Sequence, residues 1–137
     1  MILSIILAAV AMFVLGFLWH GPLFGKTWMR LANITPTGNE KLSDMWRQML
    51  LNFLADVVLA GVLYGVIKVV STSSLVTSEV TWLWGVAVAA FLWLGFVFAG
   101  SSPEVIWMNR SKKLWLFELS SSLVMLVAAG AILAGMM

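Results

Sequence analysis

The 137-residue sequence has no cysteine, a single histidine and few charged side chains. Without cysteine it cannot form a disulfide framework, a Cys-ligated zinc site or a thiol nucleophile. Only 10% of its residues are charged, against about 25% in an ordinary soluble domain, so they cannot cover a water-facing surface. The net charge is +2 and the basic residues form no patch, which excludes nucleic acid as a partner.

Hydrophobic residues, by contrast, make up 62% of the sequence, and the mean hydropathy is +1.03. Its apolar runs are long enough to cross a hydrocarbon core of about 30 Å as α-helices, and they lack the alternation of barrel strands. We therefore predict an all-α integral membrane protein, a single domain over residues 1–137 in which four transmembrane helices form a bundle. The spans are expected at about residues 1–19, 47–70, 81–100 and 114–137.

The basic residues predict how the bundle is oriented. The segment between the first two spans, counted to Arg47, holds four Lys or Arg, and the segment between the last two holds three. Lys68 is the only other one. By the positive-inside rule these two loops face the cytoplasm and both termini lie outside. We expect a multi-pass protein of a bacterial inner (plasma) membrane.

The first span lacks the basic start and the small-residue cleavage site of a signal peptide, so we expect it to be a retained helix. Most tryptophans fall near the predicted ends of spans, as in an aromatic belt. Trp93 does not, and we expect it to pack between helices.

The segment from about residue 23 to 46 is too long for a simple hairpin. Phe24, Trp28 and Leu31 recur at helical spacing, which predicts a short amphipathic helix in the headgroup layer. Thr37 and Glu40 have the spacing of a capping box, so the second span is expected to begin with a polar segment.

The loop before the fourth span carries two further helix signals. Pro103, after Ser102, is expected to open a separate short helix, because proline favours the first helical position. Ser111 is a candidate N-cap for the fourth span.

Two polar faces lie at bilayer depth, where a charge is costly. Gln48, Asn52 and Asp56 are four residues apart and form one ridge of the second span. The fourth span presents a second face, formed by Glu118, Ser121 and Ser122. We expect the two faces to meet inside the bundle and hydrogen-bond to each other. They would either hold the helices together or line a functional cavity.

His20 ends the first span, four residues after Gly16, a small residue that lets a neighbouring helix approach. A metal site there would need Asp44, Glu104 or Glu118, and no second histidine exists. We expect an interfacial hydrogen bond or headgroup contact instead, with no metal and no cofactor. The candidate cytoplasmic interface site comprises Trp19, His20, Pro22, Lys26, Trp28, Glu104 and Arg110.

Small residues also mark candidate helix contacts. Gly61 and Gly65 point well away from Asp56 on a helical wheel, so they are expected to face a partner helix, which a second subunit would supply. Gly85 with Ala89 is a further candidate for close packing.

The segment from Gly16 to Met29 contains the run Trp19-His20-Gly21-Pro22-Leu23-Phe24-Gly25-Lys26-x-Trp28. It resembles the signature of a family of small four-helix bacterial and fungal membrane proteins catalogued as a domain of unknown function. The resemblance covers nearly the whole chain and implies the four-helix fold, but no activity. The family pattern carries a small amide or Gly and then an aromatic-His pair on helix four, where this chain has Glu118 and three serines.

No catalytic constellation is evident, so we do not expect an enzyme. One hypothesis is a non-catalytic helical-bundle module that contacts lipid, partner membrane proteins or further copies of itself. The alternative is a small oligomeric transporter or channel that uses Gln48, Asn52, Asp56 and Glu118 as its lining. A water-sized cavity that reaches Asp56 would favour transport, and a closed polar cluster would favour the module.

Overall fold

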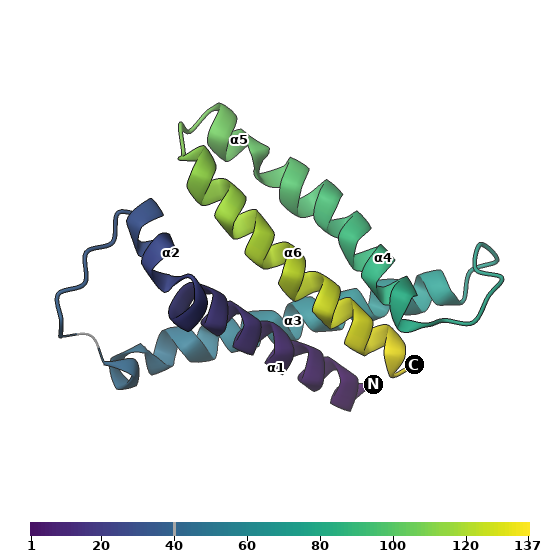
Figure 1. Cartoon of the computed structure of the whole chain (residues 1–137). Coiled ribbons are helices and arrows are strands. Elements are labelled where there is room, and N and C mark those ends of the chain that lie inside the picture. Colours follow the sequence, from purple (N-terminus) through teal and green to yellow (C-terminus); the bar gives the residue numbers. More distant parts are fainter. Residues whose placement is uncertain (40) are drawn as a thin grey trace.

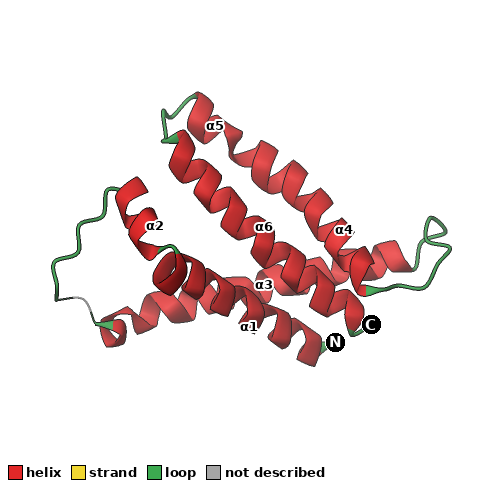
Figure 2. Cartoon of the chain, in the orientation of Figure 1, coloured by secondary structure: helices red, strands yellow, loops and turns green. Residues whose placement is uncertain are grey.

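The computed structural model describes residues 1–39 and 41–137, and within these residues it contains helices and loops but no strand (Figure 2). The predicted all-α fold is therefore confirmed. Helix α1 (Ile2–Leu18) continues into a π-helical turn, η1 (Trp19–Leu23), which is followed by α2 (Gly25–Leu31). A 3₁₀ turn, η2 (Leu42–Met45), leads into α3 (Trp46–Ser71). The C-terminal half comprises α4 (Trp82–Leu92), the π-helical η3 (Trp93–Ala99), α5 (Gly100–Ile106) and α6 (Lys112–Gly135).

Four continuous helical segments are long and apolar enough to cross a membrane, as predicted. They run over Ile2–Leu23, Ser43–Ser71, Trp82–Ile106 and Lys112–Gly135. Their apolar side chains are widely exposed on the outside of the bundle, which is what a helix surrounded by lipid requires.

The helices meet closely at one end of the molecule and diverge at the other (Figure 1). Helix α6 lies along α4 and also packs against α1, which in turn crosses α3. Both termini lie at the converging end (Figure 1), where residues 72–81 also connect α3 to α4. Helices α2 and α5 lie at the diverging end.

The apolar core combines alanines with a few large apolar side chains near the converging end. Its fully or nearly fully buried members are Ala8, Ala9, Met12, Ala60, Leu63, Ile67, Ala89, Ala129, Leu133 and Ala134. Alanine and glycine let helix backbones approach closely, which is how helices associate in lipid. This end of the bundle is therefore tightly closed.

Pro103 lies inside a continuous helix, so the predicted separate helix start at this residue is wrong. A proline cannot donate to the carbonyl four residues earlier, here that of Ala99, and normally breaks the helix. The hydroxyl of Ser102 donates to the Ala99 carbonyl at 2.8 Å, and Ser101 donates to Phe98 at 3.3 Å. These two serines, together with the wider π-helical turn η3, allow the third span to continue to Ile106.

Pro22 lies within η1 in the same way, so the first span extends past Trp19 to Leu23. The short helix predicted from Phe24, Trp28 and Leu31 is present as α2. Ser111 caps α6 as predicted, because its hydroxyl accepts a hydrogen bond from the backbone N–H of Leu114. Glu40, on which the predicted capping box depends, lies outside the described residues.

Candidate functional site

His20 and Glu118 join the first and fourth spans at the diverging end of the bundle. The ring atom Nε2 lies 3.2 and 3.1 Å from the two carboxyl oxygens of Glu118. The other ring nitrogen, Nδ1, lies 2.9 Å from the carbonyl oxygen of Gly16. Both side chains are about two-thirds buried. The interfacial hydrogen bond expected for His20 therefore exists, and its partner is a carboxyl group on another helix.

The hydrogen bonds of His20 fix the number of protons in this pair. A backbone carbonyl only accepts, so Nδ1 must carry a hydrogen. The bond between Nε2 and Glu118 then requires one further proton, placed either on the imidazole or on the carboxyl group. In both arrangements the pair has no net charge and holds one exchangeable proton between two helices.

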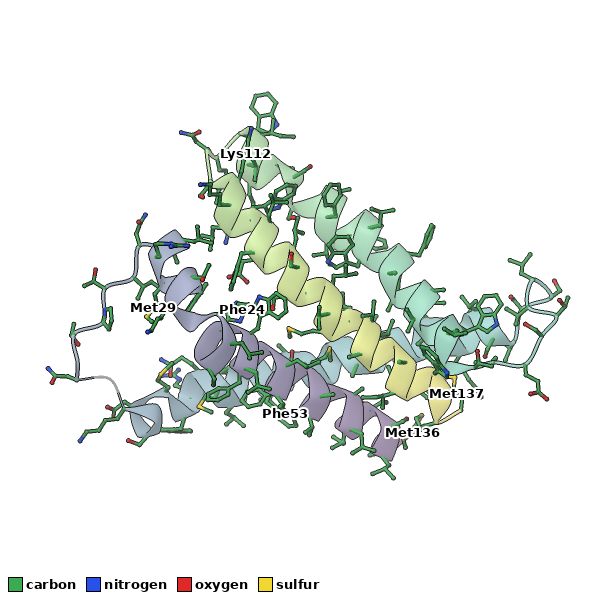
Figure 3. All side chains as sticks on the ribbon, viewed as in Figure 1. Phe24, Met29, Phe53, Lys112, Met136 and Met137 are labelled. Atoms are coloured by element: carbon green, nitrogen blue, oxygen red, sulfur yellow. The ribbon has the colours of Figure 1, made fainter. Side chains whose placement is uncertain are left out.

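Aromatic rings pack against the histidine of this pair. Trp28 of α2 and Phe117 of α6 meet the His20 ring edge to face, with centroids 5.2 and 5.7 Å away. Phe24 packs against Trp19 at 4.7 Å and lies between α2 and α6, where Figure 3 labels it. Gly25 permits this arrangement, because a β-carbon there would lie 3.1 Å from the carbonyl oxygen of His20.

A cavity of about 420 Å³, which we call the His20 cavity, lies beside the pair between α1, α3 and α6. Gln48, Asn52 and Phe17 are exposed residues in its wall, so it opens to the surface. Its lining consists of Phe13, Gly16, Phe17, His20, Gln48, Met49, Asn52, Glu118 and Met125.

Asp56 lies next to this cavity without lining it. Its carboxyl group is buried, with 7% of the residue exposed, and accepts a hydrogen bond of 3.1 Å from the side-chain amide of Asn52. The cavity thus reaches Asn52, and Asp56 lies one turn further along α3. The cavity therefore does not reach Asp56, as the transport hypothesis required, and the polar residues do not form the closed cluster that the module hypothesis required.

Gln48 and Asn52 line the same cavity as Glu118, but the predicted hydrogen bonds between the two polar faces are absent from the described residues. Glu118 bonds to His20 of the first span instead of the second span. The Ser121 hydroxyl donates a hydrogen bond of 3.6 Å to the sulfur of Met125. Ser122 accepts a hydrogen bond of 2.9 Å from Trp93, which packs between helices as expected. The prediction missed that α1 lies between the polar ends of α3 and α6.

A smaller cavity of about 210 Å³, the Arg110 cavity, lies on another side of Glu118. Arg110 and Glu104 form an ion pair there, and Trp115 donates to the Ser101 hydroxyl at 2.8 Å. The predicted interface residues are therefore divided. Trp28 contacts the His20 ring and Trp19 packs against Phe24 and Phe117, whereas Glu104 and Arg110 border the second cavity. Lys26 and Pro22 are exposed and line neither.

Several cavity residues were missed from the sequence, because each looked like an ordinary lipid-facing or core side chain. Phe13, Phe17 and His20 are spaced four and three residues apart, which places them on one helix face. That spacing was the available signal. Met125 shares the helix face of Glu118 and Ser121 by its spacing. Met49 gave no signal, since methionine fills apolar gaps of many shapes.

No three His, Asp or Glu side chains come together as potential metal ligands within residues 1–39 and 41–137. The resulting fold is a four-span membrane bundle with a mostly apolar cavity at one end, in which a few polar groups are gathered. Residues 3–134 match the family described as "Protein of unknown function (DUF1761)". The chain belongs to this family, in agreement with the resemblance noted in its sequence. Neither the curated proteins nor the solved structures contain a match.

Proposed function

We propose that the protein is a non-catalytic membrane module that takes a small molecule into the His20 cavity. The observation that carries this proposal is a cavity of about 420 Å³ with a few polar groups on a mostly apolar wall. Small-molecule sites are cavities of roughly 300–1,000 Å³ with this kind of lining. Within the family-like signature, His20 lines the cavity and Trp28 packs against the His20 ring.

The cavity is separated from the converging end of the bundle by a packed layer. Beyond Asn52 lie the buried Asp56 and then the core residues Ala9, Met12, Ala60 and Ala129, each at most 1% exposed apart from Asp56. A packed layer of this kind leaves no space for water. The arrangement supports binding at one side in preference to conduction through the bundle.

The distribution of basic residues supports an orientation. The segments 20–47 and 101–113, which connect spans at the diverging end, hold seven of the eight Lys and Arg residues. We infer that this end faces the cytoplasm of a bacterial cell and that both termini lie outside, in the inner membrane. The ligand would then enter from the cytoplasmic side.

The exposed apolar surface of the bundle is suited to contact with lipid. Gly61 and Gly65 lie on α3, and no side chain comes within 4 Å of a β-carbon built on either. This face is open to lipid, and a second copy or another membrane protein would find two small residues for close packing.

Transport is the second candidate, and one observation favours it. The hydrogen bond from Asn52 to Asp56 carries the polar lining past the end of the cavity towards the middle of α3. A transporter would need a second state in which the layer around Ala60 separates. The two π-helical segments are the elements that such a change would use.

Cysteine accessibility distinguishes these functions, and the natural absence of cysteine makes every single-cysteine variant unambiguous. Gln48→Cys and Asn52→Cys place a thiol in the cavity wall, and Ala60→Cys places one in the closed layer. Asn39→Cys and Ser74→Cys report the two faces of the membrane. An impermeant maleimide would be applied separately to each face of sealed vesicles.

We expect Gln48→Cys and Asn52→Cys to react from the same face as Asn39→Cys, and Ala60→Cys to stay unlabelled. Reaction of Ala60→Cys from the face that labels Ser74→Cys would support transport. Protection of residues 48 and 52 from both faces would overturn the proposed binding function. Labelling of Asn39→Cys from outside the cell would reverse the proposed orientation.

A further inference from the structure

We propose that the His20 cavity binds an amphipathic organic cation, a primary ammonium carrying one aromatic or alkyl group, in exchange for the proton shared by His20 and Glu118. This inference rests on the proposed function, since it names the ligand class of the same cavity. It follows from the charge, the hydrogen-bonding groups and the apolar walls that meet there.

The charged and polar groups of the cavity favour a hydrogen-bond donor with positive charge. Glu118 is the acidic residue in the lining of the cavity, and Asp56 lies directly behind Asn52. Because the amide N–H group of Asn52 is bound to Asp56, the carbonyl oxygen of Asn52 is left as the acceptor. Gln48 supplies a second amide oxygen at the cavity opening. An ammonium group offers three donors and suits such acceptors.

The same groups disfavour an anion. No Lys or Arg of the described residues lines the cavity. An anion there would face the carboxyl group of Glu118, with Asp56 behind Asn52, and would find no compensating charge. Arg110 and Glu118 both line the Arg110 cavity, but the guanidinium of Arg110 is paired with Glu104. Among the described residues, His20 is the basic side chain that pairs with Glu118.

The apolar wall of the cavity favours a cation that carries an aromatic or alkyl group. Phe13 and Phe17 lie on one face of α1, and Met49 and Met125 complete the lining from α3 and α6. Aromatic faces attract cations, most strongly where water is excluded. Met125 also lies against Gly16, with its methyl carbon 3.3 Å from where a β-carbon would be. A flexible thioether at this point can adjust to ligands of different shape.

Binding of the cation releases the shared proton. Without ligand, His20 and Glu118 together hold one proton beyond the one on Nδ1. When the ammonium binds, it donates to the Glu118 carboxylate, and His20 stays neutral with its hydrogen on Nδ1, bonded to Gly16. One positive charge enters and one proton leaves, so the cavity never carries an uncompensated charge, which would be costly at this depth.

The experiment uses three probes of nearly equal shape and different charge: 2-phenylethylammonium, the neutral 2-phenylethanol and the anionic phenylacetate. Each is titrated by calorimetry into the full chain purified in detergent. Titrations in two buffers of different ionisation enthalpy count the protons released. The variants are Glu118→Gln, whose amide can still donate to His20 Nε2, and Glu79→Gln, the same substitution on an exposed loop between α3 and α4. Circular dichroism checks that both variants are folded.

We expect the ammonium probe to bind at least about tenfold more tightly than the other two, since a charged hydrogen bond is about twice as strong as a neutral one. Its binding should release about one proton per molecule. Glu118→Gln should lose that preference and the proton release, while Glu79→Gln should keep both. The proton count on the unmodified protein needs no variant, so misfolding of Glu118→Gln would leave the test intact.

Equal binding of the three probes, or tighter binding of phenylacetate, would overturn the ligand class while leaving the His20 cavity as a binding site. Ammonium binding without proton release would overturn the exchange. Failure of all three probes, with residues 48 and 52 still reactive in their cysteine variants, would also overturn the ligand class. Failure of both experiments would overturn the proposed function itself.

Discussion

Gly85 of α4 and Gly130 of α6 lie so close that a β-carbon added to Gly85 would be 1.8 Å from the carbonyl oxygen of Gly130. The reverse distance, from a β-carbon on Gly130 to the Gly85 oxygen, would be 2.3 Å. The backbones of the two helices are therefore in contact, with Ala89 and Ala134 beside them. Helices in lipid are held together largely by such packing, so this crossing anchors α4 to the bundle.

Gly85→Ala and Gly130→Ala should each destabilise the protein by about 1–3 kcal/mol, because the added methyl group forces two backbones apart. The free energy of unfolding can be measured by titrating the detergent-solubilised protein with sodium dodecyl sulfate and following its helicity. The effect should come from lost packing between α4 and α6, with little change in the helix content of the folded state.

Gly61→Ala and Gly65→Ala are the matched controls, because a β-carbon at either position meets nothing within 4 Å. Alanine favours a helix interior over glycine by about 0.5–1 kcal/mol, so these variants should be as stable as the natural protein or slightly more so. Equal stability of the Gly85→Ala and Gly61→Ala variants would contradict the close crossing.

His20→Ala, Glu118→Ala and the double variant form a cycle that measures how strongly the first and fourth spans are coupled. We expect a coupling free energy of about 1–2 kcal/mol, in the range of hydrogen bonds between transmembrane helices and charge-assisted ones. The same unfolding titration provides the measurement. If the two single effects simply add, the bond of 3.1–3.2 Å contributes nothing to stability.

The fold could be predicted closely because membrane insertion imposes few choices on an apolar chain. Four runs of about 20 apolar residues have to become four helices, and Ser111 marks the start of α6 by its side chain alone. Pro103 misled the prediction, since local rules assign proline to a helix start. The hydroxyl of Ser102 replaces the missing donor of Pro103, and this role cannot be identified from residue types without knowing the backbone.

The candidate site was predictable only in part. The spacing of Asn52 and Asp56 correctly indicated that they share a face of one helix, and their hydrogen bond follows from it. The partner of Glu118 depends on how the helices are arranged around one another. Residues 98 positions apart in the sequence, such as His20 and Glu118, are brought together by packing that helix periodicity does not specify.

Asp56→Asn should change the free energy of unfolding by no more than about 0.5 kcal/mol. The buried side chain accepts a hydrogen bond from Asn52 through one oxygen, and an amide oxygen does this equally well. Asp56→Ala should cost about 1–2 kcal/mol, because it leaves a cavity and removes the acceptor of a buried amide. The same unfolding titration compares the two. If Asp56→Asn and Asp56→Ala lowered the free energy of unfolding by the same large amount, the charge of Asp56 would itself be required for stability.

Ser102→Ala should destabilise the protein by about 1 kcal/mol, but only while Pro103 is present. In the natural chain the Ser102 hydroxyl satisfies the Ala99 carbonyl, at 2.8 Å, because Pro103 has no N–H to offer it. In a Pro103→Ala background the new backbone N–H can reach the same carbonyl, so loss of the hydroxyl should cost less than about 0.3 kcal/mol. Unfolding titrations of the two single variants and the double variant give the comparison. An equal cost of Ser102→Ala in both backgrounds would mean that the serine does not compensate for the proline, and that η3 alone lets the third span continue.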